Sequence, residues 1–292
     1  MPGAQDQTDQ ATPLPAPSAI ILAAGKGTRM RSDLPKVVHP VGGRAMVCAV
    51  VDACLRIGCG KVVVVVGYKQ ELVREALKGY GPEVVFAVQD EQLGTGHAVR
   101  CAAPAFEGTD GEVFVLCGDG PLIRSSTLET MLERHRSAGA AATLATSVIE
   151  DPSGYGRIVR DAHGRFARIV EEKNASPEQR AIREVNPSYY VFRVRALFDA
   201  LGRVERNPAS GEYYLTDVPE LLLRSGQRWG GVEVIDAVPP EDVLSINTPE
   251  QLEEVNRIFS ERRMQAEEPG ARGSGAPDAR TGGAGARSGG EG

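Results

Sequence analysis

Short β-branched runs alternate with longer helical patterns through most of this sequence, and this alternation constrains the fold more than any other feature. The strand-like runs are residues 19–23, 62–66, 84–88, 113–116 and 142–146. Apolar residues between them recur at helical spacing, and they predict helices over residues 45–57, 70–77, 96–103 and 125–138. Strands and helices in this order build βαβ units, whose strands are parallel. We therefore predict an α/β fold with a mainly parallel sheet.

The pattern changes after Glu150. Residues 157–160 and 168–171 flank His163-Gly164-Arg165, which is typical of a hairpin turn and predicts added antiparallel strands. A last helix is predicted over residues 248–263. It starts at Asn247 or Thr248, both of which suit an N-cap, with Pro249 in the first turn.

Composition predicts one domain between two irregular ends. Residues 1–18 are rich in proline and poor in large aliphatic residues, and residues 265–292 contain mainly Gly, Ala, Arg, Ser and Glu. Such segments bury too little apolar surface to offset the entropy of ordering. We expect a disordered N-terminal extension over 1–18, a domain over 19–264 and a disordered Gly/Ala/Arg-rich tail over 265–292.

Charge and cysteine usage narrow the class of protein. The chain has 33 Lys and Arg against 39 Asp and Glu, so its net charge is −6, which argues against nucleic-acid or anionic-membrane partners. The five cysteines lack C-x-x-C spacing and are interpreted as buried hydrophobes. No apolar run approaches the ~18 residues of a membrane span, and no secretory signal is visible. We predict a cytoplasmic protein.

A glycine-rich loop follows the first predicted strand, at the place where α/β sheets bind ligands. The dinucleotide fingerprint fails because its third glycine would be Met30, and the P-loop pattern fails as well. Gly25 and Gly27 still let backbone N–H groups approach oxyanions, and Lys26, Arg29 and Lys36 add three cations. This enrichment in an acidic chain suits a triphosphate, whereas the alternative is an ordinary β–α turn with solvated charges.

Several separated strings carry a specific resemblance. Residues 20–36 (I-I-L-A-A-G-K-G-T-R-M-R-S-D-L-P-K) resemble the signature of sugar-phosphate nucleotidyltransferases. Further similar strings, in the same order along the chain, lie at 37–46, 89–97, 118–123, 154–158, 169–173 and 211–217. Together they resemble the uridylyltransferase domain of the bacterial bifunctional N-acetylglucosamine-1-phosphate uridylyltransferase/glucosamine-1-phosphate acetyltransferases. The resemblance implies a Rossmann-like three-layer α/β/α nucleotidyltransferase domain of the glycosyltransferase-A-like type.

The resemblance implies a magnesium-dependent transfer of UMP from UTP to N-acetylglucosamine-1-phosphate. The products are UDP-N-acetylglucosamine, a precursor for peptidoglycan or other glycans, and pyrophosphate. The phosphate nucleophile is already ionised, so catalysis depends on positioning and charge neutralisation. Asp119 and Asn247 are implied as Mg²⁺ ligands, and Arg29 and Lys36 would stabilise charge on the phosphates. The alternative for Asp119 and Asn247 is helix capping.

The resemblance also implies residues that bind the two substrates. The nucleotide set comprises Ala23, Ala24, Gly25, Gly27, Lys36, Gln89, Gly94 and Thr95, with Gln89 reading the edge of uracil. The sugar set comprises Gly156, Glu171 and Asn186, whose carboxylate and amide suit pyranose hydroxyls. His97 is expected to orient the helix start, since no proton abstraction is needed.

Some positions depart from the family pattern and leave alternatives open. Asn186 is followed by Pro187 and Ser188 where a small Thr-Gly pair is usual, and Gly120 and Cys117 are also atypical. Another hexose-1-phosphate is therefore an alternative acceptor, and a catalytically silent nucleotide-sensing domain is a second alternative. No hexapeptide repeats follow Arg263, so neither acetyl transfer nor a β-helix trimer is expected. A monomer is favoured, with the oligomeric state open.

Overall fold

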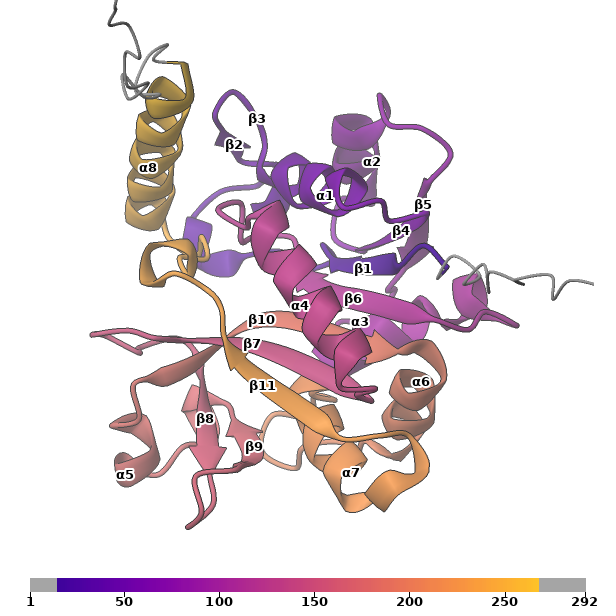
Figure 1. The fold of residues 1–292 in the computed structure, drawn as a ribbon. Coiled ribbons are helices and arrows are strands. Elements are labelled where there is room, and N and C mark those ends of the chain that lie inside the picture. The colour runs from indigo at the N-terminus through magenta and orange to yellow at the C-terminus, as the bar shows by residue number, and fades with distance from the viewer. Residues whose placement is uncertain (1–14, 268–292) are drawn as a thin grey trace, which may run out of the picture.

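The computed structural model describes residues 15–267 (Figure 1). The strands are β1 Ser18–Leu22, β2 Pro40–Val41, β3 Arg44–Ala45, β4 Lys61–Val66, β5 Val84–Val88, β6 Glu112–Cys117, β7 Ala142–Val148, β8 Gly156–Arg160, β9 Phe166–Val170, β10 Glu184–Arg193 and β11 Val232–Asp236. The α-helices are α1 Met46–Arg56, α2 Gln70–Leu77, α3 Thr95–Cys101, α4 Ser125–Ser137, α5 Pro177–Arg180, α6 Val194–Arg203, α7 Val218–Arg224 and α8 Pro249–Glu267.

The main sheet has the strand order β11-β7-β10-β6-β1-β4-β5. All neighbours along this path are parallel except β10, which runs antiparallel to both β6 and β7. The β8–β9 hairpin joins the sheet where Val185 and Asn186 pair with Arg157 and Gly156. Because β10 is reversed, its first residues lie at the edge where β6 and β7 end. That edge holds the candidate site.

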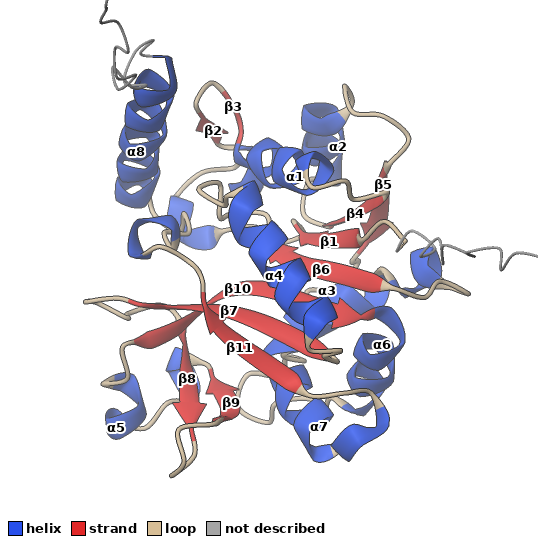
Figure 2. Ribbon diagram, in the orientation of Figure 1, coloured by secondary structure: helices blue, strands red, loops and turns tan. Residues whose placement is uncertain are grey.

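Helices cover both faces of the sheet, as Figure 2 shows. On one face α1, α2 and α4 pack against alternate strand residues such as Ile21, Val64 and Leu116. On the other face α3, α6 and α7 pack against the intervening residues, including Ile20 and Val63. Every valine of β4 is fully buried, which a central parallel strand covered on both faces requires. The predicted three-layer α/β/α fold with added antiparallel strands is therefore confirmed.

The predicted elements are present with shifts at their ends. The predictions at 70–77 and 84–88 match α2 and β5 fully, and the hairpin predicted around Gly164 is formed by β8 and β9. Strand β1 spans Ser18–Leu22, where the sequence predicted a strand over 19–23. Helix α8 spans Pro249–Glu267, where the sequence predicted a helix over 248–263. Residues 1–14 and 268–292, most of the two predicted extensions, lie outside the described residues.

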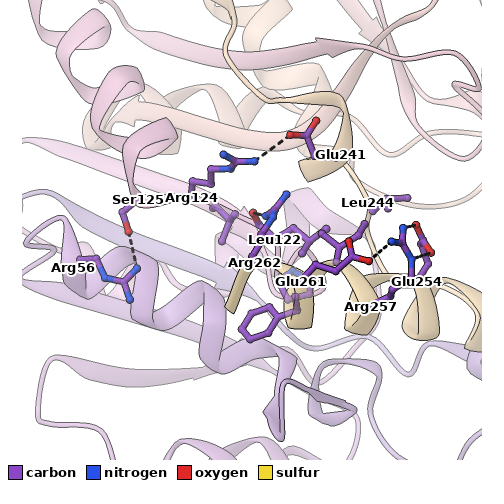
Figure 3. A pocket seen from close by; sticks show the side chains of 14 residues that line it. Arg56, Leu122, Arg124, Ser125, Glu241, Leu244, Glu254, Arg257, Glu261 and Arg262 are labelled. Carbon is purple, nitrogen blue, oxygen red and sulfur yellow. Dashed lines mark hydrogen bonds and ion pairs between the residues drawn. The ribbon is translucent and has the colours of Figure 1, made fainter. Parts of the chain in front are cut away.

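Helix α8 stands at the edge of the molecule, beside the β2–β3 turn (Figure 1). The side chain of Asn256 accepts from the backbone N–H of Gly42 at 3.0 Å, which fixes the helix to that turn. A groove of about 980 Å³ separates α8 from the start of α4 (Figure 3). Its Arg124 and Arg257 are already paired with Glu241 and Glu254. The charges of these two arginines are therefore balanced within the groove.

No helix in the described part of the chain is both long and apolar enough to cross a membrane.

Candidate active site

The loop after β1 brings Lys36 back toward the strand end. Gly27 has a φ of 71°, in the left-handed region that favours glycine. A Cβ atom on Gly27 would lie 2.5 Å from Cβ of Lys36, so the absence of a side chain permits this approach. Lys36 itself opens a short 3₁₀ turn, and Pro35 directly before it fixes the entry of the chain. The loop formed by this signature therefore folds back so that Gly27 packs against Lys36.

Four predicted residues meet at this loop. The ammonium of Lys36 forms an ion pair with the carboxylate of Asp119, and it donates to Asn247 Oδ1 at 2.9 Å. Arg29 Nη2 donates to the same amide oxygen at 2.8 Å. These residues come from the β1 loop, the end of β6 and the segment before α8. The structure therefore gathers both predicted phosphate-binding cations and both predicted metal ligands in one place.

Backbone hydrogen bonds hold the contributing segments together. The N–H of Gly118 donates to Leu22 O at 2.9 Å, which joins the end of β6 to the end of β1. The N–H of Ile246 donates to the carbonyl of Asp119 at 3.0 Å, which joins the segment before α8 to the same point. These bonds bring the segment that carries Asn247 next to Asp119.

Capping explains why the Asn247 side chain faces the cluster. The hydroxyl of Thr248 accepts from Gln251 N at 3.3 Å, and Gln251 Oε1 accepts from Thr248 N at 3.2 Å. This reciprocal pair is a capping box, so Thr248 caps α8. The amide oxygen of Asn247 remains available to Arg29 and Lys36. The sequence allowed Asn247 to be either a helix cap or an ion ligand, and the structure shows that Thr248 is the cap.

The oxygen ligands at this cluster fit a magnesium ion. Asp119 Oδ2 and Asn247 Oδ1 both face the nitrogen of Lys36, so one anionic and one neutral oxygen already converge on a cationic centre. Mg²⁺ prefers hard oxygen ligands and is usually bound by one or two protein groups together with substrate phosphates. The donor set matches that pattern.

A pocket of about 210 Å³ opens beside the loop, and five predicted nucleotide-binding residues line it: Ala24, Gly25, Gln89, Gly94 and Thr95. Two other predicted residues lie next to it. Gly27 packs against Lys36, as described above. Ala23 is buried at 1% exposure, and its N–H donates to Val65 O at 2.9 Å, so it fixes the strand end behind the pocket.

Gln89 presents a defined hydrogen-bonding pattern. The residue is 3% exposed, and its Nε2 donates to Gly94 O at 3.1 Å. The same nitrogen lies 3.1 Å from His97 Nδ1, which accepts when the histidine carries its proton on Nε2. Both amide N–H groups are then used, and the carbonyl oxygen remains as an acceptor. His97 thereby orients Gln89, as well as belonging to the first turn of α3.

The glycines around Thr95 serve packing as well as access. A Cβ atom on Gly94 would lie 2.7 Å from Tyr213 O, and one on Gly96 would lie 3.0 Å from the same oxygen. Thr95 Oγ1 accepts from Leu215 N at 3.0 Å. The strings at 89–97 and 211–217, which both carry the resemblance, therefore pack against each other in space.

Glu171 directly follows β9. Its Oε1 accepts from the hydroxyl of Thr216 at 2.9 Å. Burial raises the pKa of the Glu171 carboxyl, and the hydrogen bond from Thr216 opposes that rise. Thr95, Cys117, Glu171, Ser188 and Thr216 line a cavity of about 30 Å³, which is too small for a pyranose ring. Thr95 borders both pockets, so the two predicted substrate regions are neighbours.

Gly156 and Asn186 lie directly opposite each other where β8 pairs with β10. A Cβ atom on Gly156 would lie 3.0 Å from Ile169 Cγ2, so close packing by β9 already requires glycine there. Asn186 is 4% exposed; its Nδ2 donates to Tyr190 OH at 2.6 Å, and its Oδ1 accepts from Ser188 N at 3.2 Å. One N–H and one lone pair of the amide remain for a ligand. Neither residue lines the cavity beside Glu171.

Sequence reasoning did not single out Thr216 or Tyr155. Thr216 is 5% exposed and contacts the predicted carboxylate. Tyr155 directly precedes Gly156, and its hydroxyl contacts the segment before Asn247. Both lie inside strings that carried the resemblance, 211–217 and 154–158, but the sequence alone does not show that their side chains face the site.

Comparisons with known proteins agree with this geometry. A family model described as a MobA-like NTP transferase domain matches residues 19–211. The bifunctional protein GlmU of Geobacter metallireducens is 48% identical over 250 residues, which is 86% of this chain and 52% of that protein. GlmU of Geobacillus thermodenitrificans is 47% identical over 244 residues, covering 84% of this chain and 52% of that protein. The chain thus spans about half the length of the curated relatives it matches.

The fold is also found in a solved structure. A crystal structure from Bacillus anthracis that carries the name glucose-1-phosphate thymidylyltransferase aligns with a TM-score of 0.67. The alignment covers 84% of this chain and 95% of that chain at 19% identity, so the likeness is one of fold. Together with the family model and the sequence relatives, it confirms the resemblance that the motifs predicted. The chain belongs to the family of MobA-like NTP transferase domains and is a nucleotidyltransferase.

Proposed function

We propose that this protein transfers UMP from UTP to N-acetylglucosamine-1-phosphate, with Mg²⁺, and releases UDP-N-acetylglucosamine and pyrophosphate. The main support is the convergence of Arg29 and Lys36 with Asp119 and Asn247. Two cations and two oxygen ligands at one strand edge suit a triphosphate held with a divalent ion. The identity of 43–48% to GlmU proteins supports a sugar-phosphate uridylyltransferase.

The reaction requires positioning more than proton transfer. A phosphate oxygen of the sugar-1-phosphate attacks the α-phosphorus, a new P–O bond forms, and the bond to the pyrophosphate oxygen breaks. Bound Mg²⁺ supplies positive charge that offsets the charge of the phosphates. Lys36 and Arg29 neutralise developing negative charge, while Asp119 and Asn247 hold the ion.

Uracil selection is assigned to the carbonyl oxygen of Gln89. That oxygen is left as an acceptor because the amide N–H groups are used by Gly94 and His97. The N3–H of uracil is a donor and complements it, whereas N3 of cytosine is an acceptor and leaves both groups unpaired. An unpaired polar group in a buried site discriminates strongly against the wrong ligand.

The first experiment is pyrophosphate release from UTP and Mg²⁺ with a panel of sugar-1-phosphates, beside an Asp119→Ala control. We expect N-acetylglucosamine-1-phosphate to be the best acceptor and the control to lose roughly a hundredfold or more in kcat. If another hexose-1-phosphate is preferred, that sugar replaces N-acetylglucosamine-1-phosphate as the proposed acceptor. The turn at Pro187 and Ser188 is then the first place to look for the cause of the changed preference. UTP binding without any pyrophosphate release would contradict the proposed reaction.

A further inference from the structure

Tyr155 lies where the proposed acceptor and metal regions meet. Its hydroxyl donates to Val243 O at 3.1 Å and accepts from Ser245 N at 3.3 Å. Both backbone groups belong to the segment that leads to Asn247. Tyr155 itself directly precedes Gly156, the first residue of β8. One hydroxyl therefore connects the hairpin beside the proposed sugar region with the segment that carries a proposed magnesium ligand.

The segment before Asn247 is fixed at both of its ends. Asp242 is 1% exposed and forms ion pairs with Arg124, at the start of α4, and with Arg262 of α8; Figure 3 shows these two arginines. At the other end, Ile246 N donates to the carbonyl of Asp119. Between these anchors, the Tyr155 hydroxyl satisfies one carbonyl and one N–H of the backbone. It is therefore placed to set the conformation of residues 243–245.

The backbone of Tyr155 is in turn fixed to the acceptor side. The guanidinium of Arg157, 1% exposed, donates to the Tyr155 carbonyl and, at 3.4 Å, to Arg180 O. The next residue, Gly156, pairs with Asn186 across β8 and β10. A displacement of the β8–β9 hairpin would therefore move the Tyr155 hydroxyl and the segment it contacts.

We propose that Tyr155 is a positioning residue that couples acceptor binding to divalent-ion binding. The inference rests on the proposed function, because it requires a sugar-1-phosphate at the hairpin and an ion at Asp119 and Asn247. An acceptor that orders the hairpin also orders residues 243–245 through the tyrosine hydroxyl, which favours the Asn247 position that binds the ion. Coupling between two ligands is reciprocal, so the ion strengthens acceptor binding by the same factor.

The test measures ion binding without turnover. Free Mn²⁺ is followed by electron paramagnetic resonance in the presence of α,β-methylene-UTP, whose bridging carbon blocks transfer, with and without N-acetylglucosamine-1-phosphate. The ratio of the two Mn²⁺ dissociation constants is the coupling. We expect acceptor to tighten Mn²⁺ binding in the wild type, and Tyr155→Phe to reduce the ratio by roughly threefold to tenfold.

Tyr80→Phe is the matched control. The Tyr80 hydroxyl also contacts a backbone carbonyl, Cys48 O at 3.2 Å, and the carboxylate of Asp52, away from both substrate regions. Both variants keep the aromatic ring and remove only the hydroxyl, so thermal unfolding reports the loss of its hydrogen bonds, which at Tyr80 include one from Arg44 Nη2 at 2.7 Å. The control is expected to keep the wild-type coupling ratio.

An unchanged ratio in Tyr155→Phe would overturn the inference, and so would a wild-type ratio of one despite binding of both ligands. An equal fall in both variants would also contradict it, because the effect would then be a general loss of stability. Binding of the nucleotide analogue and of the acceptor is measured first. If either fails to bind the wild type, the proposed function itself fails, which is a different result from a missing coupling.

Discussion

Gly27 and Lys36 approach each other so closely that a single Cβ atom on the glycine would lie 2.5 Å from the Cβ of the lysine. The position of the Lys36 ammonium, between Asp119 and Asn247, therefore depends on a residue that has no side chain.

Gly27→Ala is expected to lower kcat by roughly tenfold or more, because the added methyl group displaces the Lys36 stem from the cluster. Gly58→Ala is the matched control, since Gly58 also has a positive φ, 82°, but has no atom within 4 Å of the added Cβ. Both variants should lose about 1 kcal/mol of stability from the left-handed conformation. Steady-state kinetics and thermal unfolding check this, and full activity in Gly27→Ala would contradict it.

Gln89→Leu is expected to raise the KM for UTP by roughly tenfold to a hundredfold, as the loss of a buried hydrogen-bond partner costs about 1–3 kcal/mol. The preference for UTP over CTP should fall with it, while the KM for the acceptor stays near the wild-type value. Gln70→Leu removes a glutamine side chain on α2 that accepts from Arg74, and serves as control. An unchanged UTP/CTP ratio in Gln89→Leu would remove Gln89 from base selection.

Thr216→Val is expected to shift the acid limb of kcat/KM for the acceptor to higher pH. Burial raises the pKa of Glu171 and the Thr216 hydroxyl lowers it, so loss of the hydroxyl raises the pKa further. The ionised form of Glu171, which is proposed to accept from a sugar hydroxyl, is then lost at a higher pH than in the wild type. Thr143→Val, which breaks a buried hydrogen bond of 3.0 Å to His135, is the control. A pH–rate profile that does not move would show that Glu171 does not act as an ionised acceptor.

Asp217→Asn is expected to become more stable relative to the wild type as pH rises from 4 to 7. Burial raises the pKa of Asp217 from 3.8 to about 6, and the charges of Glu220 and Glu171 add to that rise. A carboxyl whose pKa is raised by folding stabilises the folded state at pH values below its pKa in the unfolded chain. This contribution is lost as pH rises through its pKa in the folded protein. Differential scanning fluorimetry between pH 4 and 7 measures the difference in Tm.

Asp151→Asn should show the opposite trend, since hydrogen bonds from Ser153 lower the pKa of Asp151. Parallel curves for the wild type and Asp217→Asn would contradict the assigned pKa direction.

The sequence singled out four residues that the structure brings together, but it did not predict their contacts. Arg29, Lys36, Asp119 and Asn247 were identified from motifs, and the structure brings them together. The choice between Asn247 and Thr248 as helix cap was open, because both residue types favour that position. The structure decides it: Thr248 and Gln251 exchange the capping hydrogen bonds, and Asn247 Oδ1 accepts instead from Arg29 and Lys36, more than 200 positions away in the chain.

The reversed strand was beyond the reach of the sequence pattern. Residues Tyr189 to Phe192 of β10 are buried on both faces of the sheet, so this apolar run reads like the runs of the parallel strands. Its direction follows from the path of the chain through β8, β9 and α5. The register shift between Val185 and Tyr189, where Ser188 has a φ of 65°, also arises from three-dimensional pairing.

The attachment of the β8–β9 hairpin has a consequence for how this protein can diversify. The hairpin joins the main sheet through only two residue pairs, at the start of β10. Sequence changes in its outer part therefore leave the packing of the seven-strand path intact. Selection can alter the surface offered to the proposed acceptor within one contiguous stretch of chain, while the segments proposed to hold the nucleotide and the ion stay the same. The main sheet can in this sense stay constant while the β8–β9 hairpin varies.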